Sequence, residues 1–125
     1  MKMAFVLIIG GFLLATFFSC AEKIPGPKNM PPRGFFILTG TSELPCGILS
    51  MEETVVKNSA WSLFFLSKSS NPLLVRYEYM DGESFTIDYW LDKDMDGSFD
   101  EFFRDIYPVN TFFEKYPSPC DAVKN

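Results

Sequence analysis

Apolar and polar residues alternate along two neighbouring segments in the middle of the chain, residues 73–79 and 85–91. A period of two is typical of a strand with one buried face. Asp81-Gly82 lies between the segments, and this dipeptide is a strong hairpin signal because both turn residues need positive φ. The pattern predicts an antiparallel hairpin with one apolar and one mostly polar face. Trp90 falls on the polar face, so we expect it to be exposed.

The segments before this hairpin carry mixed signals. Residues 35–39 form a short aromatic-rich apolar run, which predicts a strand. Ser50 and Glu53 have the spacing of a helix capping box and predict a helix over residues 51–58. Residues 60–66 are apolar without a clear period and are compatible with a strand or a helix.

After the hairpin we expect a third strand over residues 98–104. Asn110 then has the position of an N-cap for a short helix over residues 111–116, which Pro117 would end. The predicted fold is mainly β or α+β, a small antiparallel β-meander with one or two short helices.

The N-terminus has a different pattern. Lys2 precedes an apolar stretch over residues 3–18. This stretch is shorter than the roughly 20 residues of a membrane span and fits the apolar region of a signal peptide. Ser19-Cys20-Ala21 follows it directly. Ordinary secretion with cleavage before Glu22, or an uncleaved anchor, also fits this pattern.

The small residue before Cys20 resembles the lipobox of bacterial lipoproteins. That resemblance implies a signal peptide over residues 1–19, cleavage after Ser19 and acylation of Cys20. The family's inner-membrane retention signal is an Asp at the next position, where this chain has Ala21. The resemblance thus implies a lipid anchor in the bacterial cell envelope, at the outer membrane, on either face. Several acyl chains give stable membrane anchoring.

The chain has three cysteines. If Cys20 carries lipid, Cys46 and Cys120 remain as an even pair, which would form a disulfide in an oxidising compartment. The alternative is that both are small buried apolar residues. Residues 20–34 are rich in proline and predict an extended tether, or a leader without a role. Residues 35–125 would then form the folded domain.

One segment has the composition of a metal site. Counting from Asp92, carboxylates occupy positions 1, 3, 5 and 9, and Gly97 occupies position 6. Calcium takes six to eight hard oxygen ligands, and a glycine permits the turn that brings the Ser98 carbonyl towards the ion. A divalent cation would also relieve the repulsion among the four acids.

This spacing is similar to the calcium loop of EF-hands through position 9, whereas Phe103 stands at position 12 where an EF-hand has Glu. It is closer to the D-x-D-x-D-G-x-x-D loops of integrin-type β-propellers and thrombospondin-type repeats. The resemblance implies a structural calcium ion bound by Asp92, Asp94, Asp96, Asp100 and the Ser98 carbonyl. A solvated acidic hairpin loop without metal is the alternative.

The composition of the chain disfavours several classes of function. The net charge of −5 disfavours a nucleic-acid binder, and the absence of histidine excludes Ser-His-Asp and Cys-His catalysis. We therefore expect a non-enzymatic, lipid-anchored envelope protein with a structural or adhesive role. Its aromatic residues could contact a protein or glycan partner. The alternative is a small periplasmic or secreted inhibitor or ligand-binding module whose acidic loop binds no metal.

Overall fold

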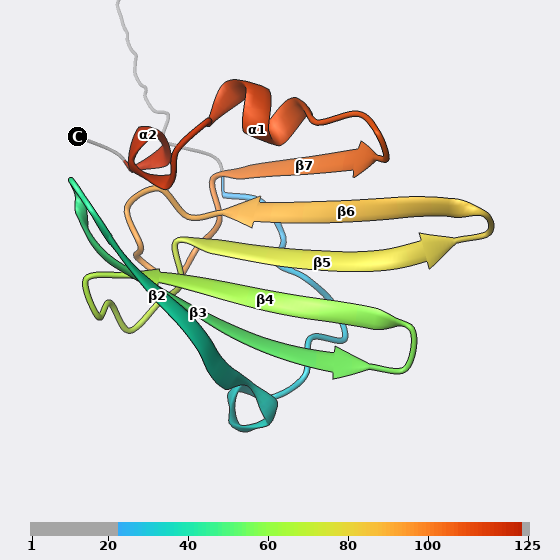
Figure 1. Cartoon of the computed structure of the whole chain (residues 1–125), viewed down its shortest axis with the longest axis horizontal. Helices are drawn as coiled ribbons and strands as arrows, with labels where there is room; N and C mark the ends of the chain where they lie inside the picture. Colours follow the sequence, from blue (N-terminus) through green and yellow to red (C-terminus); the bar gives the residue numbers. More distant parts are fainter. Residues whose placement is uncertain (1–22, 124–125) are drawn as a thin grey trace, which may run out of the picture.

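The computed structural model describes residues 23–123, and within them the chain forms a six-stranded antiparallel sheet with strand order β2-β3-β4-β5-β6-β7 (Figure 1). A short 3-10 helix, η2 (Arg33–Phe35), precedes the sheet and two short helices follow it. The elements are β2 (Ile37–Leu44), β3 (Gly47–Val56), β4 (Ser59–Leu66), β5 (Leu74–Asp81), β6 (Ser84–Leu91), β7 (Glu101–Ile106), α1 (Thr111–Lys115) and α2 (Pro119–Ala122). The predicted mainly β meander with short helices is confirmed.

Both faces of the sheet are apolar in its centre. On one face lies a core of six buried residues: Phe36, Trp61, Leu63, Phe65, Val75 and Trp90. On the other, Leu73, Tyr89 and Leu91 pack against three buried residues of the C-terminal segment, Phe112, Tyr116 and Ala122. The expectation of one mostly polar face is wrong, because a sheet covered on both sides buries both sets of alternating side chains.

Trp90 and Asp88 show the consequence for β6. Trp90 is only 8% exposed, so the expectation that it lies at the surface is wrong. Asp88 is buried on the same face, where its carboxylate accepts two hydrogen bonds from Arg104, at 2.8 and 3.0 Å, and one from the Tyr79 hydroxyl. These hydrogen bonds satisfy the Asp88 carboxylate, which the alternating pattern predicted to be exposed to water.

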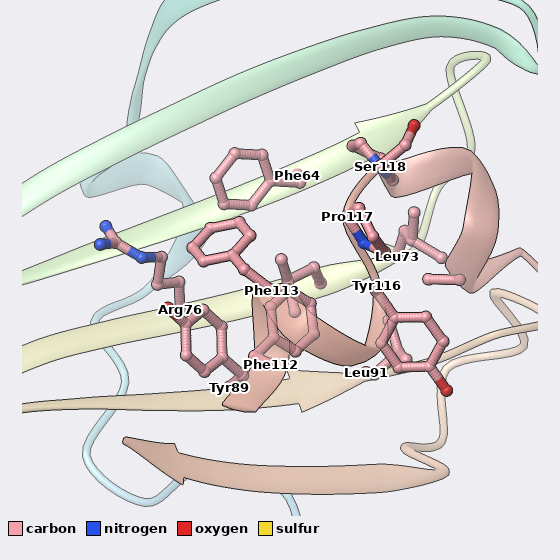
Figure 2. Close-up of a pocket in the computed structure, with 13 residues that line it drawn as sticks. Phe64, Leu73, Arg76, Tyr89, Leu91, Phe112, Phe113, Tyr116, Pro117 and Ser118 are labelled. Atoms are coloured by element: carbon pink, nitrogen blue, oxygen red, sulfur yellow. The ribbon is translucent and has the colours of Figure 1, made fainter. Parts of the chain in front are cut away.

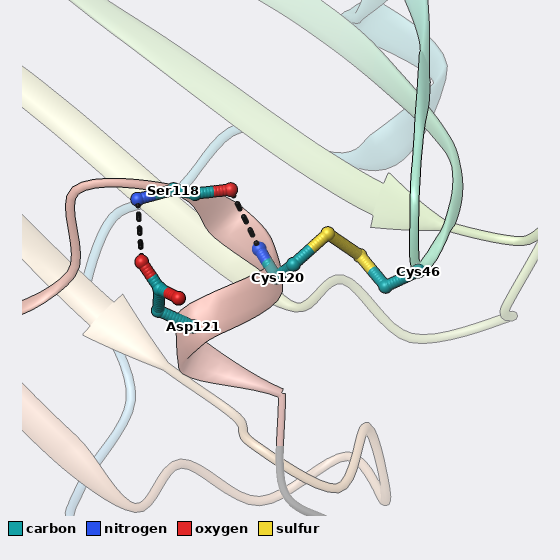
Figure 3. Close-up of a disulfide and its surroundings, with 4 residues drawn as sticks. All are labelled: Cys46, Ser118, Cys120 and Asp121. Carbon is teal, nitrogen blue, oxygen red and sulfur yellow. Dashed lines mark hydrogen bonds between the residues drawn. A yellow bond between two sulfur atoms is a disulfide. The ribbon is translucent and has the colours of Figure 1, made fainter.

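The C-terminal helices cover one face of the sheet at the β6 and β7 side (Figure 1). A disulfide between Cys46 and Cys120 joins the β2–β3 turn to α2 (Figure 3). This is the pair that the cysteine count predicts. Helix α2 begins with a capping box between Ser118 and Asp121, which the sequence reading missed. At α1, the carboxylate of Asp105, rather than the side chain of Asn110, accepts from the first backbone N–H groups.

The N-terminal strap, residues 23–36, covers the opposite face. Its blue trace in Figure 1 crosses the strands from β7 towards β3. Ile24 pairs with Phe99, its N–H donating to the Phe99 carbonyl at 3.0 Å, and Phe36 is buried at the other end. Between them, the Arg33 guanidinium lies 4.1 Å from the centre of the Phe65 ring. The proline-rich segment for which the sequence predicts a tether therefore lies against the sheet, where its prolines need no ladder partners.

The helix predicted over residues 51–58 is wrong, since these residues belong to β3 and the turn after it. Ser50 and Glu53 do not cap a helix: Ser50 pairs with Phe65 in the ladder, and Glu53 accepts from the Ser62 hydroxyl. A two-residue turn at Lys57 and Asn58 leads into β4, which settles residues 60–66 as a strand. Cross-strand pairing here outweighs a local capping signal.

Two other strands differ from their expected bounds. The expected strand over residues 35–39 begins later, at Ile37, and continues to Leu44, because β3 offers a partner along its whole length. The third strand expected over residues 98–104 begins at Glu101, because the preceding residues form a loop.

Replacing both Cys46 and Cys120 by Ala is expected to lower the free energy of unfolding by about 3–4 kcal/mol. The cross-link closes a loop with a sequence separation of 74, and its removal frees the unfolded chain. Urea denaturation of the oxidised protein measures the loss. A reducing agent should lower the free energy of unfolding of the wild type by the same amount and leave that of the double variant unchanged. A urea midpoint of the double variant equal to that of the oxidised wild type would contradict the prediction.

Glu101→Gln is expected to destabilise the protein by about 2 kcal/mol at neutral pH. Partial burial alone would raise the pKa of Glu101, but hydrogen bonds from Lys93, Tyr116 and Lys115 lower it to about 2. Because the folded-state pKa lies below the unfolded value, this stabilisation is present above pH 4.5 and is lost as the pH falls towards 2. Denaturation of both proteins across this range tests it, and a difference that does not shrink at low pH would contradict it.

Candidate cation-binding loop

The acidic segment predicted to bind calcium forms the loop between β6 and β7. It begins at Asp92, directly after β6, and closes where the Asp100 N–H donates to the Leu91 carbonyl at 2.7 Å. Gly97 has a φ of +96°, in the region that favours glycine, so the turn predicted at this position is present. The Asn71 side chain donates to the Met95 carbonyl and ties the loop to the β4–β5 connection.

Asp92 organises the loop from inside. It is 1% exposed, and its two carboxylate oxygens accept from the N–H groups of Asp96, at 3.2 Å, and Gly97, at 2.8 Å. Burial raises the pKa of Asp92 to about 6, and Asp94 also raises it, although the two backbone donors lower it. The loop therefore contains a buried carboxylate whose charge is costly at neutral pH and which a nearby cation would stabilise.

The other three acids face a single positive charge, the ammonium group of Lys23 in the strap. Its Nζ lies 2.6 Å from Asp100 Oδ1, 3.4 Å from Asp96 Oδ2 and 3.6 Å from Asp94 Oδ1. The Ser98 carbonyl oxygen is 3.5 Å away. These four groups stand at positions 3, 5, 7 and 9 of the predicted calcium loop, so the ammonium lies among four of its five predicted ligands.

This arrangement shifts the pKa values of the Lys23 ammonium and of Asp96 in the directions that favour their charged forms. The hydrogen bond to Asp100 is the largest of the effects that raise the pKa of Lys23. The Ser98 N–H, with a further contribution from Lys23, lowers the pKa of Asp96. Asp96 and Asp100 are also held by the backbone, since Ser98 N donates to Asp96 at 2.9 Å and Lys93 N donates to Asp100 at 2.7 Å.

The donor set fits a hard divalent cation. Asp92, Asp94 and Asp100 can each direct one carboxylate oxygen so that the three atoms lie within 4.8 Å of one another. Carboxylate and carbonyl oxygens are the ligands that calcium takes in proteins. Asp96 and the Ser98 carbonyl also lie close to Lys23 Nζ, the atom that Asp94 and Asp100 face. The loop could therefore surround either an ammonium group or a metal ion.

Lys23 is the residue of this loop that the sequence reading missed. It lies 77 positions before Asp100, in a segment expected to stand clear of the domain, and no local spacing marks it. Cys20 and the signal peptide predicted over residues 1–19 lie outside the described residues. Across residues 23–123, the helices are all too short or too polar to cross a membrane.

Comparison with protein-family models, curated protein sequences and solved structures finds no match to this chain. The contacts of the described residues and the sequence patterns are therefore the basis for the proposed function.

Proposed function

We propose that the chain is a lipid-anchored protein of the bacterial cell envelope with a structural or adhesive role, whose β6–β7 loop binds calcium. One observation carries the calcium part: three carboxylates and a carbonyl of the loop converge on the Lys23 ammonium. Convergence on a cation means that the loop backbone already has a curvature that aims its oxygens at one point. A chain that only needed a solvated turn would not require it.

Calcium and Lys23 would compete for the same oxygens. The loop carries four carboxylates, of which one ammonium balances one charge and a divalent ion would balance two. Lys23 is 30% exposed and its ion pairs are partly screened by water, so they are weak enough to be displaced. When calcium is present, the ion would be bound by Asp94, Asp96, Asp100 and the Ser98 carbonyl. Asp92 would either be the fifth ligand or continue to hold the loop backbone.

The anchor makes this competition relevant to the membrane. In the proposal Cys20 carries lipid, and Lys23 follows it by three residues. The clasp between Lys23 and the loop would hold the domain close to the lipid surface. Calcium would free Lys23 and, by also opening the adjacent Ile24–Phe99 pair, lengthen the connection between the anchor and the sheet, so that the domain could present its surface to a protein or glycan partner.

A second candidate function is an inhibitor or ligand-binding module, secreted or in the periplasm, whose loop binds no metal. The same ammonium favours it, since Lys23 already balances part of the charge of the loop. The two candidates differ in whether calcium binds.

Calcium at about 10 mM is expected to raise the melting temperature by roughly 5–10 °C, because a ligand with a dissociation constant of roughly 10⁻⁴ to 10⁻³ M stabilises the folded state by mass action. Asp94→Asn should weaken calcium binding because it removes the charge of one proposed ligand. Asp94 makes no hydrogen bond to the loop backbone in the described part of the chain, so the substitution should leave the loop conformation unchanged. Lys23→Met should strengthen it roughly five- to tenfold by removing the competitor.

Lys28→Met is the matched control, because Lys28 lies in the same strap and forms no ion pair among residues 23–123. It should leave calcium affinity unchanged. Isothermal titration with calcium, and with magnesium as the poorer-fitting ion, measures all four proteins. Failure of both the wild type and Lys23→Met to bind millimolar calcium would end the metal proposal and favour the second candidate.

Cys20→Ser is expected to move the protein from the membrane fraction to the soluble fraction, since acyl chains on this thiol supply the anchor in the proposal. Mass spectrometry of the N-terminal peptide should find Cys20 as the first residue with lipid attached. Cys46→Ser is the control and should stay with the membrane. An unmodified Cys20 thiol in membrane-extracted protein would contradict the anchor while leaving the calcium test unaffected.

A further inference from the structure

A cavity of about 190 Å³ lies between the sheet and the C-terminal segment (Figure 2). Its floor is formed by β4, β5 and β6, and its roof by α1, α2 and the residues between them. Five aromatic rings line it: Phe64, Tyr89, Phe112, Phe113 and Tyr116. Phe113 is 47% exposed, so the cavity reaches the surface beside this ring. An apolar cavity of about 150 Å³ holds a benzene molecule, so this one has room for an aromatic ring with a small substituent.

Three contacts hold the roof of this cavity in place. At the start of the roof, the carboxylate of Asp105 accepts from the first two N–H groups of α1, at 3.1 Å each. In the middle, the Tyr116 hydroxyl donates to Glu101 at 2.6 Å. At the end, the Cys46–Cys120 disulfide ties α2 to the β2–β3 turn. A void whose walls can move collapses at least in part, whereas these contacts keep the roof at a fixed height above the sheet.

The polar side chains in the lining are already engaged within the protein. The Ser118 hydroxyl accepts from the backbone in the capping box of α2, and the Tyr116 hydroxyl is bonded to β7. The Arg76 guanidinium is paired with Glu78, and the Tyr89 hydroxyl lies beside this guanidinium with almost no accessible surface. A polar group on a ligand would therefore lose its hydrogen bonds to water with little in return, so the cavity favours a ligand without one.

The rings of the lining favour an aromatic ligand in particular. Tyr89 and Phe112 stack with their centroids 4.2 Å apart and their planes 7° from parallel. Phe113 meets the Tyr89 ring edge to face, with the centroids 6.0 Å apart and the planes at 81°. The lining therefore contains rings in two nearly perpendicular orientations. An aromatic ligand can lie offset-parallel to one and edge-to-face to the other, and these are the two arrangements that aromatic pairs prefer.

We propose that this cavity binds a small apolar aromatic compound, about the size of toluene and without a polar group. The ring lies between the sheet and Phe113 and contacts the lining on both sides. It supplies the dispersion contacts that the side chains around the void lack, and it leaves water for an apolar site. The site is on the face opposite the strap and is independent of the acidic loop and of any anchor.

Toluene and phenol have nearly the same shape, and together they test the proposal on the purified protein. Toluene should bind with a dissociation constant on the order of 1 mM or below. Phenol should bind at least about fivefold more weakly, because its hydroxyl loses its hydrogen bonds to water on entering the cavity. Ligand-observed NMR at neutral pH measures both. No binding of toluene, or binding of phenol that is equal or tighter, would overturn the proposal.

Phe113→Leu removes one ring of the lining and should weaken toluene binding about fivefold. Phe85→Leu is the matched control, because Phe85 is 37% exposed on β6 and lies outside the lining, and it should leave the affinity unchanged. Ala122→Leu places a larger side chain in the lining and should abolish toluene binding in a protein that still unfolds cooperatively. If Ala122→Leu does not fold, Phe113→Leu still decides the matter, since its side chain is half exposed and the substitution leaves the core in place.

Three results with these variants would overturn the proposal. They are an unchanged affinity in Phe113→Leu, an equal loss in Phe85→Leu, and a folded Ala122→Leu protein that binds toluene as the wild type does.

Discussion

An open sheet with two apolar faces must be covered on both, and the rest of this structure follows from that need. The meander itself supplies no cover, since consecutive strands only extend the sheet. One face is closed by the C-terminal helices, which the Cys46–Cys120 disulfide ties to the β2–β3 turn. The other is closed by the strap, which ends in Phe36 and is paired to the β6–β7 loop through Ile24. A domain of this size depends on both covers, because its core is small.

The β6–β7 loop thereby acquires two roles. It connects the last two strands, and through Phe99 and Asp100 it holds the first residues of the strap. Three of its acids surround the Lys23 ammonium, and in the proposal calcium takes the place of that ammonium. Calcium binding, if it displaces Lys23, would act on the cover of one face while leaving the disulfide-tied face intact. The cavity beneath the C-terminal helices lies on that second face and would be unaffected.

The hairpin of β5 and β6 could be predicted because its signals are local: an alternating pattern and an Asp-Gly turn. The capping-box signal at Ser50 was equally local, but the helix it predicted was wrong because the segment pairs with β4. That pairing could not be predicted, since the apolar residues of β4 show no clear period in the sequence. The acidic loop could be identified from its spacing, but Lys23 could not, since the contact is made across the whole chain. The burial of the Tyr89 hydroxyl beside Arg76 likewise could not be predicted, because an alternating tyrosine predicts only that the position faces a core.

The strap is where the account is most directly tested. Amide hydrogen exchange of Ile24, followed by NMR in calcium-free buffer, reports whether its N–H is bonded to the Phe99 carbonyl. Strong protection is expected in the wild type, and a marked loss is expected in Lys23→Met, which lacks the contacts of the ammonium with the loop. Exchange of Ile24 in the wild type at the rate of an unstructured peptide would contradict it, because the second face of the sheet would then lack its cover.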